Sequence, residues 1–124
     1  MFQSDDAYSG FAVDDLDAAR TFYAETLGLE VATLDNGFLQ LRLASGATVL
    51  VYGKPNHAPA DFTILNFPVD DVDAAVDELN AKGVETAIYD DMPTDSKGIM
   101  RETGGPVIAW FRDPAGNVLA VHER

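Results

Sequence analysis

The chain has 124 residues, of which 21 are acidic and 8 are lysine or arginine, so its formal net charge is -13. Such a charge repels nucleic acid and anionic membrane surfaces, and neither is expected as a partner. The length suits one domain with its own hydrophobic core, and the absence of cysteine excludes disulfides and cysteine-ligated zinc.

The sequence gives no sign of a membrane segment or of a secretory signal. It contains no apolar run of about 18 residues, which a membrane-spanning helix would need. The first residues lack the basic and apolar regions of a signal peptide. We therefore expect an acidic, cytoplasmic protein.

One pattern occurs twice in the chain. Residues 11–19 read Phe-Ala-Val-Asp-Asp-Leu-Asp-Ala-Ala, and residues 67–75 read Phe-Pro-Val-Asp-Asp-Val-Asp-Ala-Ala. In each copy an apolar, β-prone run leads through two aspartates into an alanine-rich run, which indicates the end of a strand followed by an aspartate-capped helix. Because this joint is used twice, the sequence predicts two similar modules.

The first module is predicted over residues 7–53 as a strand, a helix and three further strands. Asp14 or Asp15 is expected to cap a helix whose apolar residues are spaced by three and four, and the helix is expected to end at Gly28. Asn36 and Gly37 suit the tight turn of a hairpin. The predicted strands are residues 8–13, 29–34, 38–43 and 47–52.

A linker with two prolines is predicted at residues 54–61, and the second module then occupies residues 62–124. Asp70 or Asp71 is expected to cap its helix, which Gly83 ends. A long loop is predicted at residues 90–106, and such loops are often functional. The predicted strands are residues 62–69, 84–89, 107–112 and 117–122.

Several motifs carry a resemblance to a known family. They are Asp15-Leu16, Phe22-Tyr23, Leu27-Gly28-Leu29 and the run Phe-Arg-Asp-Pro-Ala-Gly-Asn at residues 111–117. Together with the repeat, they resemble the vicinal oxygen chelate superfamily, which includes glyoxalase I, extradiol dioxygenases, fosfomycin-modifying enzymes and bleomycin resistance proteins. The resemblance implies an α+β fold in which two tandem βαβββ modules form a curled mixed sheet around a cleft, as one domain over residues 1–124. Family members often pair, so we expect a homodimer.

Enzymes of this family hold a divalent metal with His, Gln or Glu side chains from the first and fourth strands of each module. The matching positions here are Tyr8, Leu50, Ile64 and Ala120. Three of these side chains have no donor atom, and a neutral phenol is a poor lone ligand at neutral pH. We therefore expect neither a metal nor another cofactor.

Strand alternation predicts which side chains face the cleft, because every second residue shares a side and the other side packs under the helix. The aromatic and polar mixture obtained in this way is typical of a site for an organic ligand. Tyr8, Tyr52 and Trp110 could equally fill the cleft as core, and Arg42 and His122 could be solvated. The expected binding residues are Tyr8, Gln40, Arg42, Leu50, Tyr52, Ile64, Asn66, Trp110, Ala120 and His122.

The leading hypothesis is a metal-free glyoxalase/bleomycin-resistance-like protein that binds a small organic molecule in the cleft between its modules. The alternative is a lyase, isomerase or dioxygenase of the same superfamily whose metal is absent or held by unorthodox residues such as Tyr8, Tyr52 and His122. A third possibility is an interaction or regulatory domain whose cleft is filled by its own side chains. The net charge would suit a cationic ligand, whereas Arg42 in the cleft would oppose one.

Overall fold

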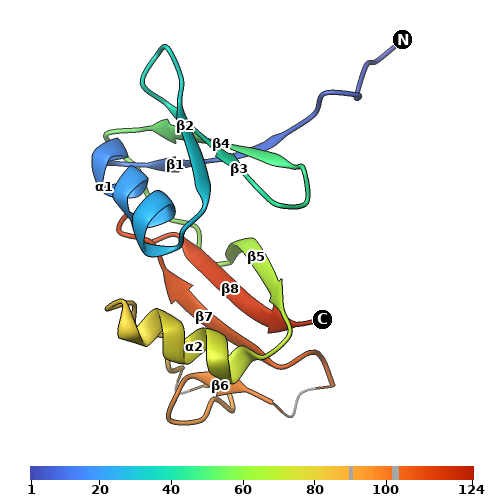
Figure 1. The fold of residues 1–124 in the computed structure, drawn as a ribbon, viewed down its shortest axis with the longest axis vertical. Coiled ribbons are helices and arrows are strands. Elements are labelled where there is room, and N and C mark those ends of the chain that lie inside the picture. The colour runs from blue at the N-terminus through green and yellow to red at the C-terminus, as the bar shows by residue number, and fades with distance from the viewer. Residues whose placement is uncertain (90, 102–103) are drawn as a thin grey trace. The chain divides into compact units, whose positions relative to one another are not determined.

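The computed structural model describes residues 1–89, 91–101 and 104–124. These residues form two compact units, Met1–Ala58 and Pro59–Arg124, which meet within the predicted linker. Each unit contains one open four-stranded mixed sheet and one helical segment, as Figure 1 shows. The fold is therefore α+β, with the same strand and helix order at the start of each unit.

The first unit is built on the sheet order β1-β4-β3-β2. β1 and β4 are parallel, whereas β3 pairs antiparallel with both β4 and β2. Gly37 and Gly46 lie in the two hairpin turns with φ of 89° and 96°, a backbone region that glycine enters easily. The strands are β1 Ser9–Val13, β2 Glu30–Thr33, β3 Leu39–Arg42 and β4 Thr48–Gly53.

The helix of the first unit begins where the sequence predicts. α1 covers Leu16–Arg20. The carboxylate of Asp15 accepts hydrogen bonds from the backbone N–H groups of Asp17 at 3.0 Å and Ala18 at 3.1 Å. Asp15 is therefore a helix cap, which satisfies donors that have no partner inside the helix.

The second half of this helix winds more widely than the sequence predicts. η1, a π-helical segment, covers Thr21–Thr26, and the backbone N–H of Leu27 donates to the carbonyl of Phe22 at 2.9 Å. The wide turn places Phe22 and Tyr23 together in the core, with their ring centroids 5.1 Å apart. Apolar spacing does not distinguish a single π turn from an α-helix, so the sequence could not predict it.

One face of the first sheet packs beneath α1 and η1, which Figure 1 shows lying against the strands. The alternate residues of the strands supply this face, and they are apolar and buried, as a helix-covered face requires. The core of the unit consists of Phe11, Val13, Ala19, Phe22, Tyr23, Leu39, Leu41, Val49 and Val51.

The second unit has the sheet order β5-β8-β7-β6, with β5 and β8 parallel and the other pairs antiparallel. α2 packs against β7 and β8. Its buried residues Val72, Val76 and Leu79 lie at helical spacing and meet the apolar side of these strands. The elements are β5 Thr63–Val69, α2 Val72–Ala81, β6 Ile99–Met100, β7 Ile108–Arg112 and β8 Val118–Glu123.

Two carboxylates satisfy the first turn of α2. Asp71 accepts a hydrogen bond from the backbone N–H of Ala74 at 3.1 Å, and Glu123 at the end of β8 accepts one from Val72 at 3.2 Å. At the other end Gly83 has φ of 85°, which suits the left-handed residue after a helix. The predicted cap and stop of this helix are thus confirmed.

Removing the cap of α2 gives a first testable prediction. Asp71→Ala is expected to lower the free energy of unfolding by about 1 kcal/mol, because the N–H of Ala74 loses its partner. The matched control is Asp70→Ala, which removes only an exposed ion pair to Arg124 and should change stability far less. Urea unfolding followed by circular dichroism measures both. Equal losses in the two variants would contradict the capping role.

The strands beside β7 differ from the prediction. Residues 84–89 form no strand, although Thr86 bridges to Phe111 and the N–H of Ala87 donates to the carbonyl of Trp110 at 2.8 Å. β6 instead arises inside the predicted loop 90–106 and pairs with the other half of the same edge of β7. Residues 90, 102 and 103 of that loop lie outside the described residues. Two short segments therefore share one edge that the sequence assigned to a single strand.

The family motif at residues 111–117 forms the turn between β7 and β8. Asp113 and Asn117 are buried and hydrogen-bond across the turn, from the Asn117 backbone N–H at 2.8 Å and from its side-chain amide at 2.9 Å. Gly116 has φ of 87°. The motif thus fixes the pairing of the two central strands, which determines the face that each of their side chains occupies.

Within the described residues, no helix has both the length and the apolar character needed to cross a membrane.

Candidate ligand-binding site

Four predicted site residues share the helix-free face of the first sheet. Gln40 pairs with Leu50 across β3 and β4, and Ala12 of β1 pairs with Tyr52. Arg42 follows Gln40 at the next position on the same side of β3. The face assignment made from strand alternation is therefore confirmed for Gln40, Arg42, Leu50 and Tyr52.

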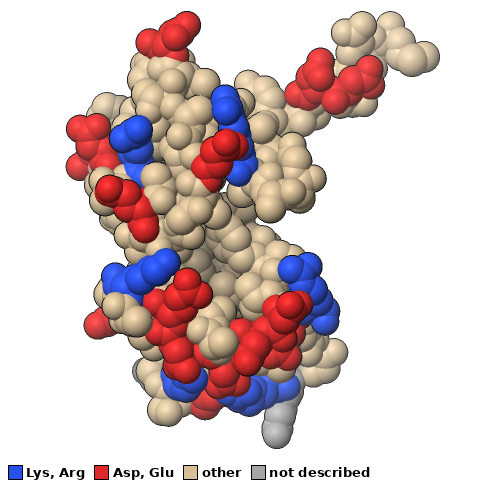
Figure 2. All heavy atoms as spheres, viewed as in Figure 1, with Lys and Arg blue, Asp and Glu red and all other residues tan. Residues whose placement is uncertain are grey.

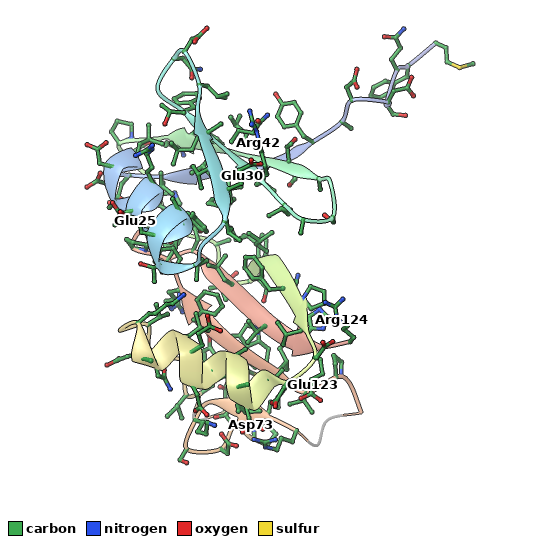
Figure 3. The ribbon with its side chains drawn as sticks, in the orientation of Figure 1. Glu25, Glu30, Arg42, Asp73, Glu123 and Arg124 are labelled. Atoms are coloured by element: carbon green, nitrogen blue, oxygen red, sulfur yellow. The ribbon has the colours of Figure 1, made fainter. Side chains whose placement is uncertain are left out.

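The charge on this face is already engaged by neighbouring groups. The Nε of Arg42 donates to the side-chain oxygen of Gln40 at 3.0 Å. Glu30 is its direct partner in the strand register, and Figure 3 shows both side chains at the same part of the sheet. Tyr52 contacts the ring of Phe38 with centroids 6.2 Å apart. Arg42 is thus a surface residue beside an acid, which weakens its attraction for an anionic ligand.

Tyr8 lies outside this arrangement. It precedes the first paired residue of β1, and its side chain is 67% exposed. An exposed tyrosine before the strand has the correct parity for the helix-free face but no neighbouring strand to fix its position.

The second sheet brings four more predicted residues together on its helix-free face. Asn66 of β5 and Trp110 of β7 both pair with Ala120, which lies between them on β8. His122 is two residues further along β8 and pairs with Ile108. The alternation predicted from sequence is confirmed at these positions too.

Ile64 departs from that alternation. A register shift lies between Thr63, which pairs with Val118, and Leu65, which pairs with Leu119. Ile64 is therefore the extra residue of a bulge. Thr63 shares the side of Val118 and Ala120, so it occupies the place on the helix-free face that alternation assigned to Ile64.

His122 is half-buried and has a defined ring orientation. Its Nδ1 lies 3.0 Å from the carbonyl oxygen of Glu123. A carbonyl can only accept a hydrogen bond, so Nδ1 must carry the proton when the ring is neutral. Nε2 is then left as the basic nitrogen.

A pocket of about 290 Å³ lies at the start of β5 in the second unit, and we call it the aromatic pocket. Trp110 is its central ring: the indole N–H donates to the hydroxyl of Thr63 at 3.1 Å, and the ring of Tyr89 meets it edge-on at 5.8 Å. Trp110 is also the one predicted site residue in the lining. The pocket is lined by Asp61, Phe62, Thr63, Tyr89, Asp91, Met92, Trp110 and Val118.

The other residues of the aromatic pocket were missed in the sequence for two reasons. Thr63 reaches it because of the bulge, which has no sequence signature. Tyr89 was assigned to a predicted strand at residues 84–89 that does not form, and Asp91 and Met92 belong to the predicted loop, where no periodicity assigns a face. The available signals were the length of that loop and the aromatic residues at its start and at Phe62.

Comparison with known proteins decides the family. Residues 7–121 match the sequence model of the Glyoxalase/Bleomycin resistance protein/Dioxygenase superfamily. The chain belongs to this superfamily. It is 30% identical over 126 residues to the protein YraH of Bacillus subtilis (strain 168), covering 90% of this chain and 91% of that one.

Solved structures of the superfamily share the fold. TnmS3, an antibiotic binding protein from Streptomyces sp. CB03234, is 25% identical with a TM-score of 0.68, over 98% of each chain. FosX, a genomically encoded fosfomycin resistance protein from Listeria monocytogenes, has a TM-score of 0.72 at 16% identity, over 95% of this chain and 91% of that one. At that identity the likeness to FosX shows the fold alone.

The residues at the superfamily's metal positions do not fit a divalent metal. Leu50 and Ala120 lie on helix-free faces but offer no donor atom, and the side chain of Ala120 is 0% exposed. Ile64 has no donor either, and Tyr8 stands alone. Among the described residues, no group of three or more His, Cys, Asp or Glu side chains could hold a metal ion.

A network of charges ties the residues on both sides of β6 to α2. Asp73 accepts from Arg101 at 2.8 Å and from Lys97 at 3.2 Å, and Lys97 also contacts Asp77 at 2.9 Å. Asp95 accepts from the backbone N–H of Ile99 at 2.9 Å. Figure 2 shows basic and acidic side chains interleaved over this unit, and Figure 3 labels Asp73.

These contacts shift the ionisation of the carboxylates in one direction. Hydrogen bonds from Arg101 and Lys97 lower the pKa of Asp73, and the backbone N–H of Ile99 lowers the pKa of Asp95. A carboxyl whose pKa is lowered on folding adds stability above its ordinary pKa. That stability is lost as the pH falls through the lowered pKa of the folded protein.

We therefore predict that acid lowers the stability of the folded protein partly by protonating Asp73. Between about pH 5 and about pH 2, the urea midpoint of Asp73→Asn should fall less steeply than that of the wild type. The reason is that the variant has no carboxylate at residue 73 whose protonation would lower its stability. Asp35→Asn, in an exposed turn of the first unit, is the matched control and should follow the wild type. A wild-type slope in Asp73→Asn would contradict this role.

Proposed function

We propose that this member of the superfamily is a metal-free protein that binds a small organic molecule on the helix-free faces of its sheets. The observation that carries the proposal is the aromatic pocket beside Trp110, which joins the helix-free face of the second sheet. Small-molecule sites usually combine apolar or aromatic walls with a few polar groups, and this pocket has that composition. The proposed binding residues are the ten positions predicted from the sequence. Thr63, the neighbour of Ile64, is added to them.

Two further observations support binding rather than metal chemistry. Three of the four residues at the family's metal positions lack donor atoms and the fourth, Tyr8, is a poor lone ligand, so these positions offer no evident means of activating a substrate through a divalent ion. TnmS3, whose name describes an antibiotic binding protein, is similar over 98% of this chain. A role in binding a drug-like molecule is consistent with both observations.

A thermal-shift screen of small organic molecules, with and without divalent metals, tests the proposal. A ligand that binds only the folded protein raises its stability by about 2.7 kcal/mol at one hundred times its dissociation constant. We expect stabilising compounds whose effect does not depend on added metal. Tightly bound, stoichiometric Zn, Ni, Mn or Fe in the purified protein would overturn the metal-free assignment.

The orientation of His122 favours one second candidate, an enzyme that uses this residue as a general base. With Nδ1 held by the Glu123 carbonyl, Nε2 is free to accept a proton from a substrate on the same face as Trp110. This candidate predicts turnover of a small carbonyl, thiol-conjugate or phenolic compound that His122→Ala abolishes. Binding of the same compound without turnover would favour the binding protein instead.

A further inference from the structure

Among the described residues that line the aromatic pocket, the charged side chains are all acidic. Asp61 and Asp91 line it, whereas none of its eight lining residues is lysine, arginine or histidine. Both aspartates are exposed. Within the described residues, neither carboxylate has a hydrogen-bond or ion-pair partner, so both negative charges are available to a ligand.

Two further pockets of this unit differ in this respect. One is lined by Asp95 and Arg101, which pair with each other at 3.2 Å. The other contains Lys97, whose ammonium group is paired with Asp73 and Asp77. The second of these pockets also contains Glu85 beside Lys97. The aromatic pocket is therefore the one of these three whose described lining has acidic side chains and no basic one.

The rings of the pocket supply a second kind of attraction for positive charge. The faces of aromatic rings are electronegative and attract cations within about 6 Å. The indole N–H of Trp110 is already used by Thr63, so the ring lines the pocket without a free N–H donor. Phe62 adds a ring that is 66% exposed, and Met92 adds a polarisable sulfur.

We infer that the aromatic pocket binds an organic cation, with a positively charged nitrogen on a small and largely apolar body. This inference rests on the proposed function, in which the ligand is a small organic molecule. It adds that the ligand is positively charged. Two carboxylates repel an anion, and a neutral molecule gains no charge–charge attraction from them. Among the described residues of its lining, a bare metal ion would find only two carboxylates, too few charged donors to replace its water.

A pair of probes of equal shape tests the charge. 3-Hydroxyphenyltrimethylammonium carries a quaternary nitrogen, and 3-tert-butylphenol replaces that nitrogen with carbon. Trp110 is the only tryptophan in the chain, so its emission reports binding at the pocket. We expect the cation to bind the intact protein about tenfold more tightly than the neutral probe, and this preference to shrink in high salt.

Matched variants separate the pocket from the overall charge of -13. In Asp61→Asn/Asp91→Asn the preference for the cation should fall to about twofold or less, since the local charges are gone. Asp14→Asn/Asp35→Asn makes the same change in net charge in the first unit and should keep the full preference. An equal loss of the preference for the cation in both double variants would assign that preference to net charge. It would overturn the assignment of the cation site to the aromatic pocket.

The outcomes also separate this inference from the proposed function. If the neutral probe binds the wild type as tightly as the cation, the preference for cations is wrong while small-molecule binding stands. If neither probe changes the emission of Trp110 but other compounds stabilise the protein in the thermal-shift screen, the pocket assignment alone fails. If no compound of any charge binds, both fail.

Discussion

Replacing Phe111 with alanine is expected to lower the free energy of unfolding by about 3–5 kcal/mol, the largest change in stability that we predict. The side chain is 1% exposed and lies beneath α2 on β7. Its ring stacks on that of Phe67, with centroids 6.5 Å apart and an angle of 27° between the planes. Its removal leaves a cavity in the centre of the second unit that the neighbouring strands cannot close.

Urea unfolding followed by circular dichroism measures this loss. Phe111→Leu is the matched control, because it keeps most of the buried volume and should cost about 1.5 kcal/mol or less. A loss below about 1 kcal/mol for Phe111→Ala would show that the second sheet is not packed around this residue.

The adjacent residue should behave in the opposite way. Trp110→Ala is expected to weaken binding of 3-hydroxyphenyltrimethylammonium by at least about tenfold, because a central aromatic anchor is removed. Its effect on stability should be smaller than that of Phe111→Ala, since Trp110 is half-buried on the helix-free face. Isothermal titration calorimetry replaces fluorescence here, because the variant has no tryptophan.

Two controls separate the roles of the Trp110 ring. Trp110→Phe keeps an aromatic face but not the hydrogen bond to Thr63, so it should retain part of the affinity. Thr63→Val removes the hydrogen bond while the indole ring stays. Full wild-type affinity in Trp110→Ala would place the binding site elsewhere in the protein.

Much of the fold was predictable because its signals are local. Asp15 and Asp71 precede the helices that they cap, and Gly28, Gly37 and Gly83 have the positive φ that the predicted turns and helix ends need. The alternation of apolar residues then fixed the faces of the paired strands. Each of these features is decided by a few neighbouring residues.

The parts that could not be predicted depend on distant neighbours. The bulge at Ile64 is defined by its register with β8, and β6 exists because Ile99 and Met100 find the free edge of β7. The π turn of η1 is selected by how its rings pack against the sheet. Sequence spacing alone carries none of this information.

The candidate site also has a part that local sequence signals predict and a part that they do not. Gln40, Leu50, Asn66 and His122 lie on the faces that alternation gave them, because strand pairing preserves alternation. The aromatic pocket depends instead on a bulge and on Tyr89, Asp91 and Met92, whose positions follow from tertiary contacts. Trp110 belongs to both sets, and it is the residue on which the proposed function depends most.

The most direct test of small-molecule binding on the helix-free faces is amide chemical-shift mapping by NMR. The protein would be kept in a chelator and titrated with the compound that stabilises it most in the thermal-shift screen. We expect the shifted amides to cluster around Thr63, Trp110 and Ala120, with saturation at one molecule per chain. Shifts confined to the α2 side of the second sheet, or binding that appears only when a divalent metal is restored, would contradict a metal-free ligand site on these faces.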